Sequence, residues 1–136
     1  MYRVWDNKEK VWVRDVFLSP NNDLWIKKKT QFGNKKFSLV SDERYKYQLA
    51  ICETDINGIA IYEGDICKAK DGKVGLIAYA PEKAAYLFFD YNNYKYYQLD
   101  KNICNTHLEI IGNIFETPEL IPDLKEDKNE SSKSNK

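Results

Sequence analysis

The sequence predicts a mainly β protein made of short antiparallel strands. Apolar and polar residues alternate with a period of two in several segments, and sustained helical periodicity is absent. Ten Tyr, six Phe and three Trp add the aromatic side chains that favour pleated surfaces. Turn-forming Gly, Pro, Asn and Asp residues interrupt these segments at short intervals. We therefore expect a small antiparallel barrel with an N-terminal β meander packed on it.

The N-terminal region, residues 1–48, is expected to contain four short strands. They are predicted at residues 2–5, 10–17, 24–29 and 36–40, with polar turns between them. A few short strands rarely persist unaided, and this region is polar. We expect it to pack against the rest of the chain or against a neighbouring subunit.

Residues 49–122 carry the stronger strand and turn signals. Asp71-Gly72 predicts a two-residue type I′ turn that joins strands at residues 65–69 and 73–79. A second hairpin is expected to join residues 84–89 to 94–99, and residues 108–111 would supply a closing strand. Five strands between residues 60 and 115 fit a small SH3-like barrel.

Two further segments of this region have turn or helix signals. The polar stretch at residues 102–106 is predicted to be a turn. Thr117-Pro118 predicts an N-cap followed by proline at the first position of a single helical turn.

The last residues, 123–136, are nearly all Lys, Glu, Asp, Asn and Ser. They lack the apolar area that would offset the entropy of ordering, so we expect a disordered polar tail. No apolar run approaches the roughly 18 residues of a membrane span, and no apolar segment follows the first residues as in a signal peptide. We expect a cytoplasmic protein with no membrane partner.

The cysteines and the histidine give no metal-binding pattern. Cys52, Cys67 and Cys104 are odd in number and lie in apolar, strand-like contexts, so reduced core thiols are expected. No closely spaced cysteine pair exists, and His107 is the single histidine. Nucleotide-binding glycine motifs are also absent. We therefore expect neither a structural metal nor a cofactor.

Two arrangements of side chains could form a catalytic site. Glu63 and Asp65 flank Gly64 and could act as acid and base, but a turn in which Asp65 accepts backbone N–H groups is the favoured interpretation. Cys104 and His107 could form a nucleophile and base, yet no orienting third group or oxyanion site is recognisable. We expect no enzymatic activity.

The net charge of zero hides an asymmetry. Residues 1–48 contain eleven Lys or Arg and six Asp or Glu, a net charge of +5. Residues 49–136 contain ten basic and fifteen acidic residues, a net charge of −5. This asymmetry has three interpretations: the two halves attract each other within one chain, copies of the chain associate head to tail, or the basic half binds an anionic partner. The sequence leaves these alternatives open.

One segment of the basic half combines cations with aromatic rings, as single-stranded nucleic acid binding requires. Its candidate binding residues are Trp25, Lys27, Lys28, Lys29, Lys35 and Lys36. Lysines on strand edges also prevent edge-to-edge aggregation, and this needs no ligand. The tyrosines of residues 86–97 are expected to pack on a sheet or to contact a protein partner.

Three segments, in order, resemble the YopX family, small proteins found mostly in phages and prophages. The first is Tyr2-Arg3-Val4-Trp5-Asp6, and the third is Ile110 to Leu120. The second lies between residues 47 and 65 and departs from the family pattern at Ala50-Ile51-Cys52. Its matching residues are Gln48, Asp55, Asn57, Gly58, Ile61, Tyr62, Glu63, Gly64 and Asp65.

The resemblance implies a mostly β fold with an SH3-like barrel and a phage or prophage setting, and it assigns no catalytic residues. Together with the residues, it predicts a self-associating protein-binding or assembly module, a homo-oligomer with a phage or host protein partner. The alternative is a nucleic-acid-binding protein that uses the segment from Trp25 to Phe37.

Overall fold

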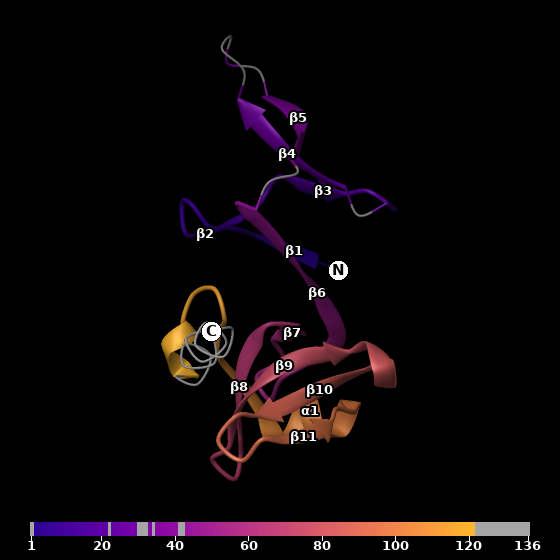
Figure 1. Cartoon of the computed structure of the whole chain (residues 1–136), viewed down its shortest axis with the longest axis vertical. Coiled ribbons are helices and arrows are strands. Elements are labelled where there is room, and N and C mark those ends of the chain that lie inside the picture. The colour runs from indigo at the N-terminus through magenta and orange to yellow at the C-terminus, as the bar shows by residue number, and fades with distance from the viewer. Residues whose placement is uncertain (1, 22, 30–32, 34, 41–42, 122–136) are drawn as a thin grey trace, which may run out of the picture. The chain divides into compact units, whose positions relative to one another are not determined.

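The computed structural model describes residues 2–21, 23–29, 33, 35–40 and 43–121 (Figure 1). The chain divides into two compact units. We call residues 2–48 the N-terminal unit and residues 49–121 the C-terminal unit, and each is described by itself. Antiparallel strands dominate both units, which confirms the predicted mainly β class.

The N-terminal unit contains the predicted meander. Its strands are β1 (Tyr2–Asp6), β2 (Val11–Val13), β3 (Val16–Leu18), β4 (Leu24–Lys29) and β5 (Lys35–Val40). The strand predicted at residues 10–17 is split into β2 and β3. β1 pairs with β2, and β3, β4 and β5 form a three-stranded sheet. Val4, Leu24 and Ile26 are buried in a small core of this unit.

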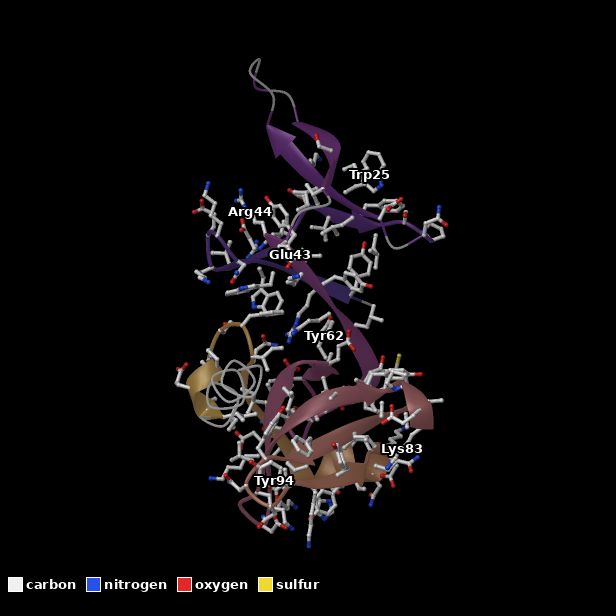
Figure 2. The ribbon with its side chains drawn as sticks, in the orientation of Figure 1. Trp25, Glu43, Arg44, Tyr62, Lys83 and Tyr94 are labelled. Carbon is white, nitrogen blue, oxygen red and sulfur yellow. The ribbon has the colours of Figure 1, made fainter. Side chains whose placement is uncertain are left out.

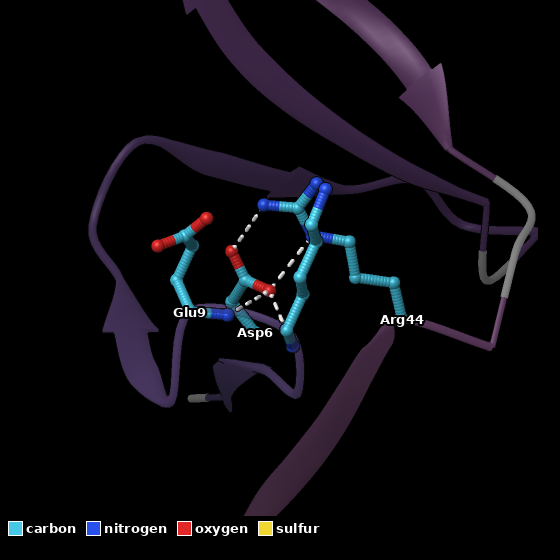
Figure 3. Close-up of polar contacts among 4 residues, drawn as sticks. Asp6, Glu9 and Arg44 are labelled. Carbon is cyan, nitrogen blue, oxygen red and sulfur yellow. Dashed lines mark hydrogen bonds and ion pairs between the residues drawn. The ribbon is translucent and has the colours of Figure 1, made fainter.

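A partly buried ion pair ties the β1–β2 turn to the segment before β6 (Tyr45–Thr54) (Figure 3). The two carboxylate oxygens of Asp6 accept hydrogen bonds from Nε and Nη2 of Arg44 at 2.8 and 2.7 Å. Oδ1 also accepts from the backbone N–H groups of Lys8 and Glu9. The Arg44 hydrogen bonds hold the pKa of Asp6 well below its ordinary value.

The C-terminal unit is built around a five-stranded antiparallel sheet with the order β11-β10-β9-β8-β12. Its strands are β8 (Asp65–Ala69), β9 (Val74–Ala80), β10 (Ala85–Asp90), β11 (Lys95–Gln98) and β12 (Leu108–Asn113). β6 begins in the N-terminal unit and continues into the C-terminal unit, where it pairs with β7 (Ala60–Tyr62). The core consists of Ile61, Cys67, Ile77, Phe88, Cys104 and Leu108.

Three predicted strand connections are present. β8 pairs with β9, β10 pairs with β11, and β12 closes the sheet beside β8. The β8–β9 turn differs from the predicted two-residue type I′ turn. Gly72 has a φ of 94°, Asp71 has no positive φ, and Gly72 N–H donates to the Ala69 carbonyl. Four residues, 70–73, therefore connect the strands, and Gly72 occupies the left-handed position.

The prediction of a turn at residues 102–106 is wrong, because helix α1 (Lys101–His107) occupies this segment. Asp100 caps it, since Oδ1 of Asp100 accepts a hydrogen bond from Ile103 N–H at 2.8 Å. Cys104 is buried in the core, so capping and burial outweigh the weak helix propensity of the asparagines and threonine. None of the helices in the described ranges has the length and apolar character needed to cross a bilayer.

The predicted turn at Thr117-Pro118 forms as the 3₁₀-helix η2 (Pro118–Leu120), with proline at its first position. The Thr117 hydroxyl does not cap it, and instead accepts a hydrogen bond from Asn113 N–H at 3.0 Å. A Cβ at Gly112 would collide with Thr117 and Leu120. Glycine at residue 112 thus lets η2 pack closely on β12.

We predict that Asp6→Asn destabilises the N-terminal unit at pH 7 and makes its stability less dependent on pH. The pKa of Asp6 is lowered by folding, so its contribution is present above the unfolded pKa of about 3.9 and is lost as the pH falls below that value. All three tryptophans, Trp5, Trp12 and Trp25, belong to this unit. Urea unfolding followed by tryptophan fluorescence at pH 7 and pH 3 therefore measures the effect.

Asp15→Asn is the matched control, because Asp15 is exposed in the same unit. It should leave the unfolding midpoint at pH 7 nearly unchanged. An Asp6→Asn variant as stable as the parent at pH 7, with the same loss of stability at pH 3, would show that the ion pair contributes nothing.

Candidate functional site

Two buried carboxylates connect the segments that carry the family resemblance. The first is Asp55. Oδ1 of Asp55 accepts hydrogen bonds from the backbone N–H groups of Asn57 and Ile59 at 2.9 and 3.0 Å. Oδ2 accepts from Ile110 N–H at 3.0 Å. One side chain thus shapes the β6–β7 turn and fixes that turn to β12.

Asp65 makes the second connection. Oδ2 of Asp65 accepts from Tyr62 N–H at 2.8 Å, and Oδ1 accepts from the side-chain amide of the buried Asn113 at 3.1 Å. Between these residues, Gly64 N–H donates to the Ile77 carbonyl and the Gly64 carbonyl accepts from Ile114 N–H. The turn before β8 is therefore held against both β9 and the end of β12.

These contacts give the Glu63 and Asp65 pair a structural role. Asp65 is buried and its oxygens accept bonds from the fold, whereas Oε1 of Glu63 accepts from Leu49 N–H at 3.3 Å. The two carboxylates thus hold different parts of the backbone. Within residues 2–121, as far as they are described, no group of three His, Cys, Asp or Glu could hold a metal ion.

Cys104 and His107 lie one helical turn apart on α1 but do not form a nucleophile and base. Cys104 is fully buried, and burial raises the pKa of its thiol to about 11, so the thiol is protonated at neutral pH. Nδ1 of His107 contacts the Thr106 hydroxyl at 2.6 Å. The arrangement lacks the activated thiolate that nucleophilic chemistry needs.

The expectation that all cysteines are core residues is right for two of them. Cys67 and Cys104 belong to the core of the C-terminal unit, and burial also raises the pKa of Cys67. Cys52 is exposed, contrary to the expectation. It has a φ of 68° where the pairing of β6 with β7 is irregular, and this irregularity turns the side chain outward.

The candidate nucleic-acid-binding residues share one hairpin. In the register of β4 and β5, Lys28 is opposite Lys36 and Lys29 is opposite Lys35, while the side chains of these four lysines lie outside the described part. Lys27 is exposed and Trp25 is half-buried. Trp25 and Lys27 alternate with the buried Leu24 and Ile26, so both face away from the small core.

Trp25 also belongs to an apolar stripe that the sequence did not reveal. Phe17 on β3 is directly opposite Trp25, and Leu39 on β5 is opposite Trp25 from the other side. Phe17 and Leu39 are each 52% exposed. Figure 2 shows Trp25 projecting from the β4 ribbon. We call Phe17, Trp25 and Leu39 the apolar stripe; it appears only when the three strands are aligned.

The C-terminal unit carries a second aromatic surface. The Phe89 ring lies 4.3 Å from Tyr91, 4.6 Å from Tyr96 and 6.4 Å from Tyr94, measured between ring centroids. Tyr94 is 65% exposed and Tyr96 is 61% exposed. Nζ of Lys83 lies 5.7 Å from the Tyr96 ring centre. We call Phe89, Tyr91, Tyr94 and Tyr96 the aromatic cluster, and Figure 2 labels Tyr94 and Lys83 beside the sheet.

A buried carboxylate shapes the turn that presents this cluster. Asp90 ends β10, and its Oδ1 accepts hydrogen bonds from the N–H groups of Asn92 and Asn93. Oδ2 accepts from the Asn93 side-chain amide at 2.8 Å. Tyr94 follows in the left-handed region, with a φ of 53°. The turn thus fixes the backbone at the point from which Tyr94 projects.

A small pocket opens on the other face of the same sheet. Its volume is about 190 Å³. Residues from β8, β10, β11, α1 and β12 and from the β8–β9 turn line it: Ala69, Asp71, Lys73, Phe88, Tyr97, Ile103, His107 and Leu108. Phe88 pairs with Tyr97 in register and belongs to the core, so this face is opposite the one that carries Phe89 and Tyr96.

The solved structures similar to this chain include two bacterial proteins. The crystal structure of protein EF1440 from Enterococcus faecalis has 23% sequence identity and a TM-score of 0.52. The crystal structure of protein YopX from Bacillus subtilis has 17% identity and a TM-score of 0.58. Each match covers 88% of this chain and 96% of the other chain, and at this identity it shows the fold alone.

A search of curated proteins found no match to this chain. A family model described as YopX protein matches residues 1–122, and this confirms the resemblance seen in the sequence. The match includes the N-terminal strands, the Asp55 and Asp65 turns and the closing strand. The chain therefore belongs to the YopX family.

Proposed function

We propose that this chain is a phage- or prophage-encoded, non-enzymatic protein that self-associates and acts as a protein-binding or assembly module in the cytoplasm. The observation that carries the proposal is the aromatic cluster. Two tyrosine rings, Tyr94 and Tyr96, are more than half exposed while they contact Phe89. Exposed contiguous aromatic surface is characteristic of protein interfaces, where tyrosine is enriched.

The cluster is also preorganised, which lowers the cost of binding. Tyrosine offers a large contact area with few rotatable bonds. Here the rings contact one another through Phe89, and the Asp90 carboxylate fixes the adjoining turn. Ordering each free side chain at an interface costs about 0.5–1.5 kcal/mol, so rings that are already ordered keep more of their contact energy.

The charge distribution supports a second copy of the chain as a partner. Residues 1–48 carry a net charge of +5 and residues 49–136 carry −5. Opposite charges on the two halves attract when one copy presents its basic half to the acidic half of another. The non-enzymatic part of the proposal is supported by the hydrogen bonds of Asp55 and Asp65 to the fold and by the burial of Cys104.

Replacement of both Tyr94 and Tyr96 by serine should weaken self-association by at least about tenfold, because central aromatic anchors contribute roughly 2 kcal/mol or more. Sedimentation equilibrium over micromolar concentrations, at low and moderate salt, measures the effect. Tyr47→Ser is the matched control, since Tyr47 is an exposed tyrosine of β6 outside the cluster. The mass of one chain for the unmodified protein under all these conditions would reject the proposal.

The second candidate function is binding of single-stranded nucleic acid by the β4–β5 hairpin. The favouring observation is the register that brings four lysines of two strands together, next to a face with Trp25 and Lys27. The cations would contact phosphates and the indole ring would stack on a base. Because strand side chains alternate between faces, about three lysines can contact one ligand.

Replacement of Lys27, Lys28 and Lys29 by serine should then abolish retention on single-stranded DNA without changing the tryptophan-detected unfolding midpoint. With about three phosphate contacts, the log of the affinity of the unmodified protein should fall with log salt at a slope near −2. Leu39→Ser should leave retention unchanged, because leucine offers no ring for stacking. Failure of the unmodified protein to bind at low salt would eliminate this candidate.

A further inference from the structure

We propose that the pocket beside α1 is the acceptor site of a contact between two copies of this chain, and that the Tyr94 ring of the second copy fills it. The inference rests on the proposed self-association and names one further contact within it, separate from the attraction between the basic and acidic halves. Among the described residues, Tyr94 is the most exposed large apolar side chain. The pocket is apolar and also belongs to the C-terminal unit, so each copy carries both the ring and the pocket.

The size of the pocket favours one aromatic ring over a whole metabolite. Pockets for drug-sized ligands enclose roughly 300–1,000 Å³, whereas this one has about 190 Å³. Ala69, Phe88 and Leu108 give it an apolar lining, and Ile103 contributes from α1. A single side chain that inserts into such a pocket is the usual anchor of a protein interface.

The polar groups of the pocket favour a neutral ring that carries a hydroxyl. Nζ of Lys73 pairs with Oδ2 of Asp71 at 2.6 Å and lies 5.3 Å from the centre of the Tyr97 ring. This pair brings no net charge, so an anionic or cationic ligand gains little from it. The Asp71 carboxylate and the His107 ring supply hydrogen-bonding atoms for a phenol, which phenylalanine would leave unused.

The alternation of side chains explains why the ring must come from a second copy. Phe88 and Tyr97, which line the pocket, lie on one face of the sheet, whereas the aromatic cluster surrounds Phe89 on the opposite face. Tyr94 contacts Phe89 on that opposite face and cannot enter the pocket of its own chain. Its positive φ and the Asp90-bonded turn hold it in a projecting position.

The pocket is tested first with p-cresol, the side-chain analogue of tyrosine, in an NMR titration of the ¹⁵N-labelled full chain. The expected result is saturable shifts at the amides of Ala69, Lys73, Phe88 and Leu108, with weaker binding of toluene, which lacks the hydroxyl. Ala69→Leu should fill the pocket and remove the shifts. Ala69→Val serves the same purpose if the leucine variant does not fold.

Sedimentation equilibrium then identifies the occupant. Tyr94→Ser and Ala69→Leu should each weaken self-association by about tenfold or more, whereas Tyr96→Ser, two residues away in the same cluster, should have a clearly smaller effect. Equal effects of Tyr94→Ser and Tyr96→Ser, or no p-cresol shifts at the pocket, would overturn the inference and leave self-association intact. If the chain binds p-cresol but stays monomeric, then Tyr94 of a second copy is not the occupant of the pocket, and the proposed self-association is also wrong.

Discussion

Two buried carboxylates, Asp55 and Asp65, determine the architecture of the C-terminal unit. A buried charge is costly unless it is hydrogen-bonded, and here the backbone N–H groups of Ile59, Tyr62 and Ile110 supply these bonds. Each carboxylate joins segments that are distant in the sequence. Asp55 and Asp65, which belong to the segments that carry the family resemblance, therefore hold the turns around them to the closing strand β12.

This framework separates the two faces of the five-stranded sheet. Once the register of β10 and β11 is set, Phe88 and Tyr97 must lie on the core side, and Phe89 and Tyr96 must lie on the other. The same pairing therefore places the pocket on one face of the sheet and the aromatic cluster on the other. In our proposal, these two surfaces are the ones through which two copies bind.

The strands and their hairpins could be predicted because alternation and turn residues are local signals. The helix α1 was missed because its weak helix formers gave no periodic pattern, and Asp100, its cap, was the one local signal. The apolar stripe could not be predicted, since Phe17 and Leu39 flank Trp25 only after three strands align. Cys52 was misplaced because an irregular pairing reverses the alternation there.

A double-mutant cycle between Asp65 and Asn113 tests the structural role of the family residues most directly. Unfolding free energies would be measured for Asp65→Ala, Asn113→Ala and the double variant by following NMR amide signals of the C-terminal unit during urea unfolding. Our account predicts that both single variants are destabilised and that their effects are coupled by about 0.5–3 kcal/mol. Folded single variants whose small effects add, with a loss of partner binding instead, would contradict it.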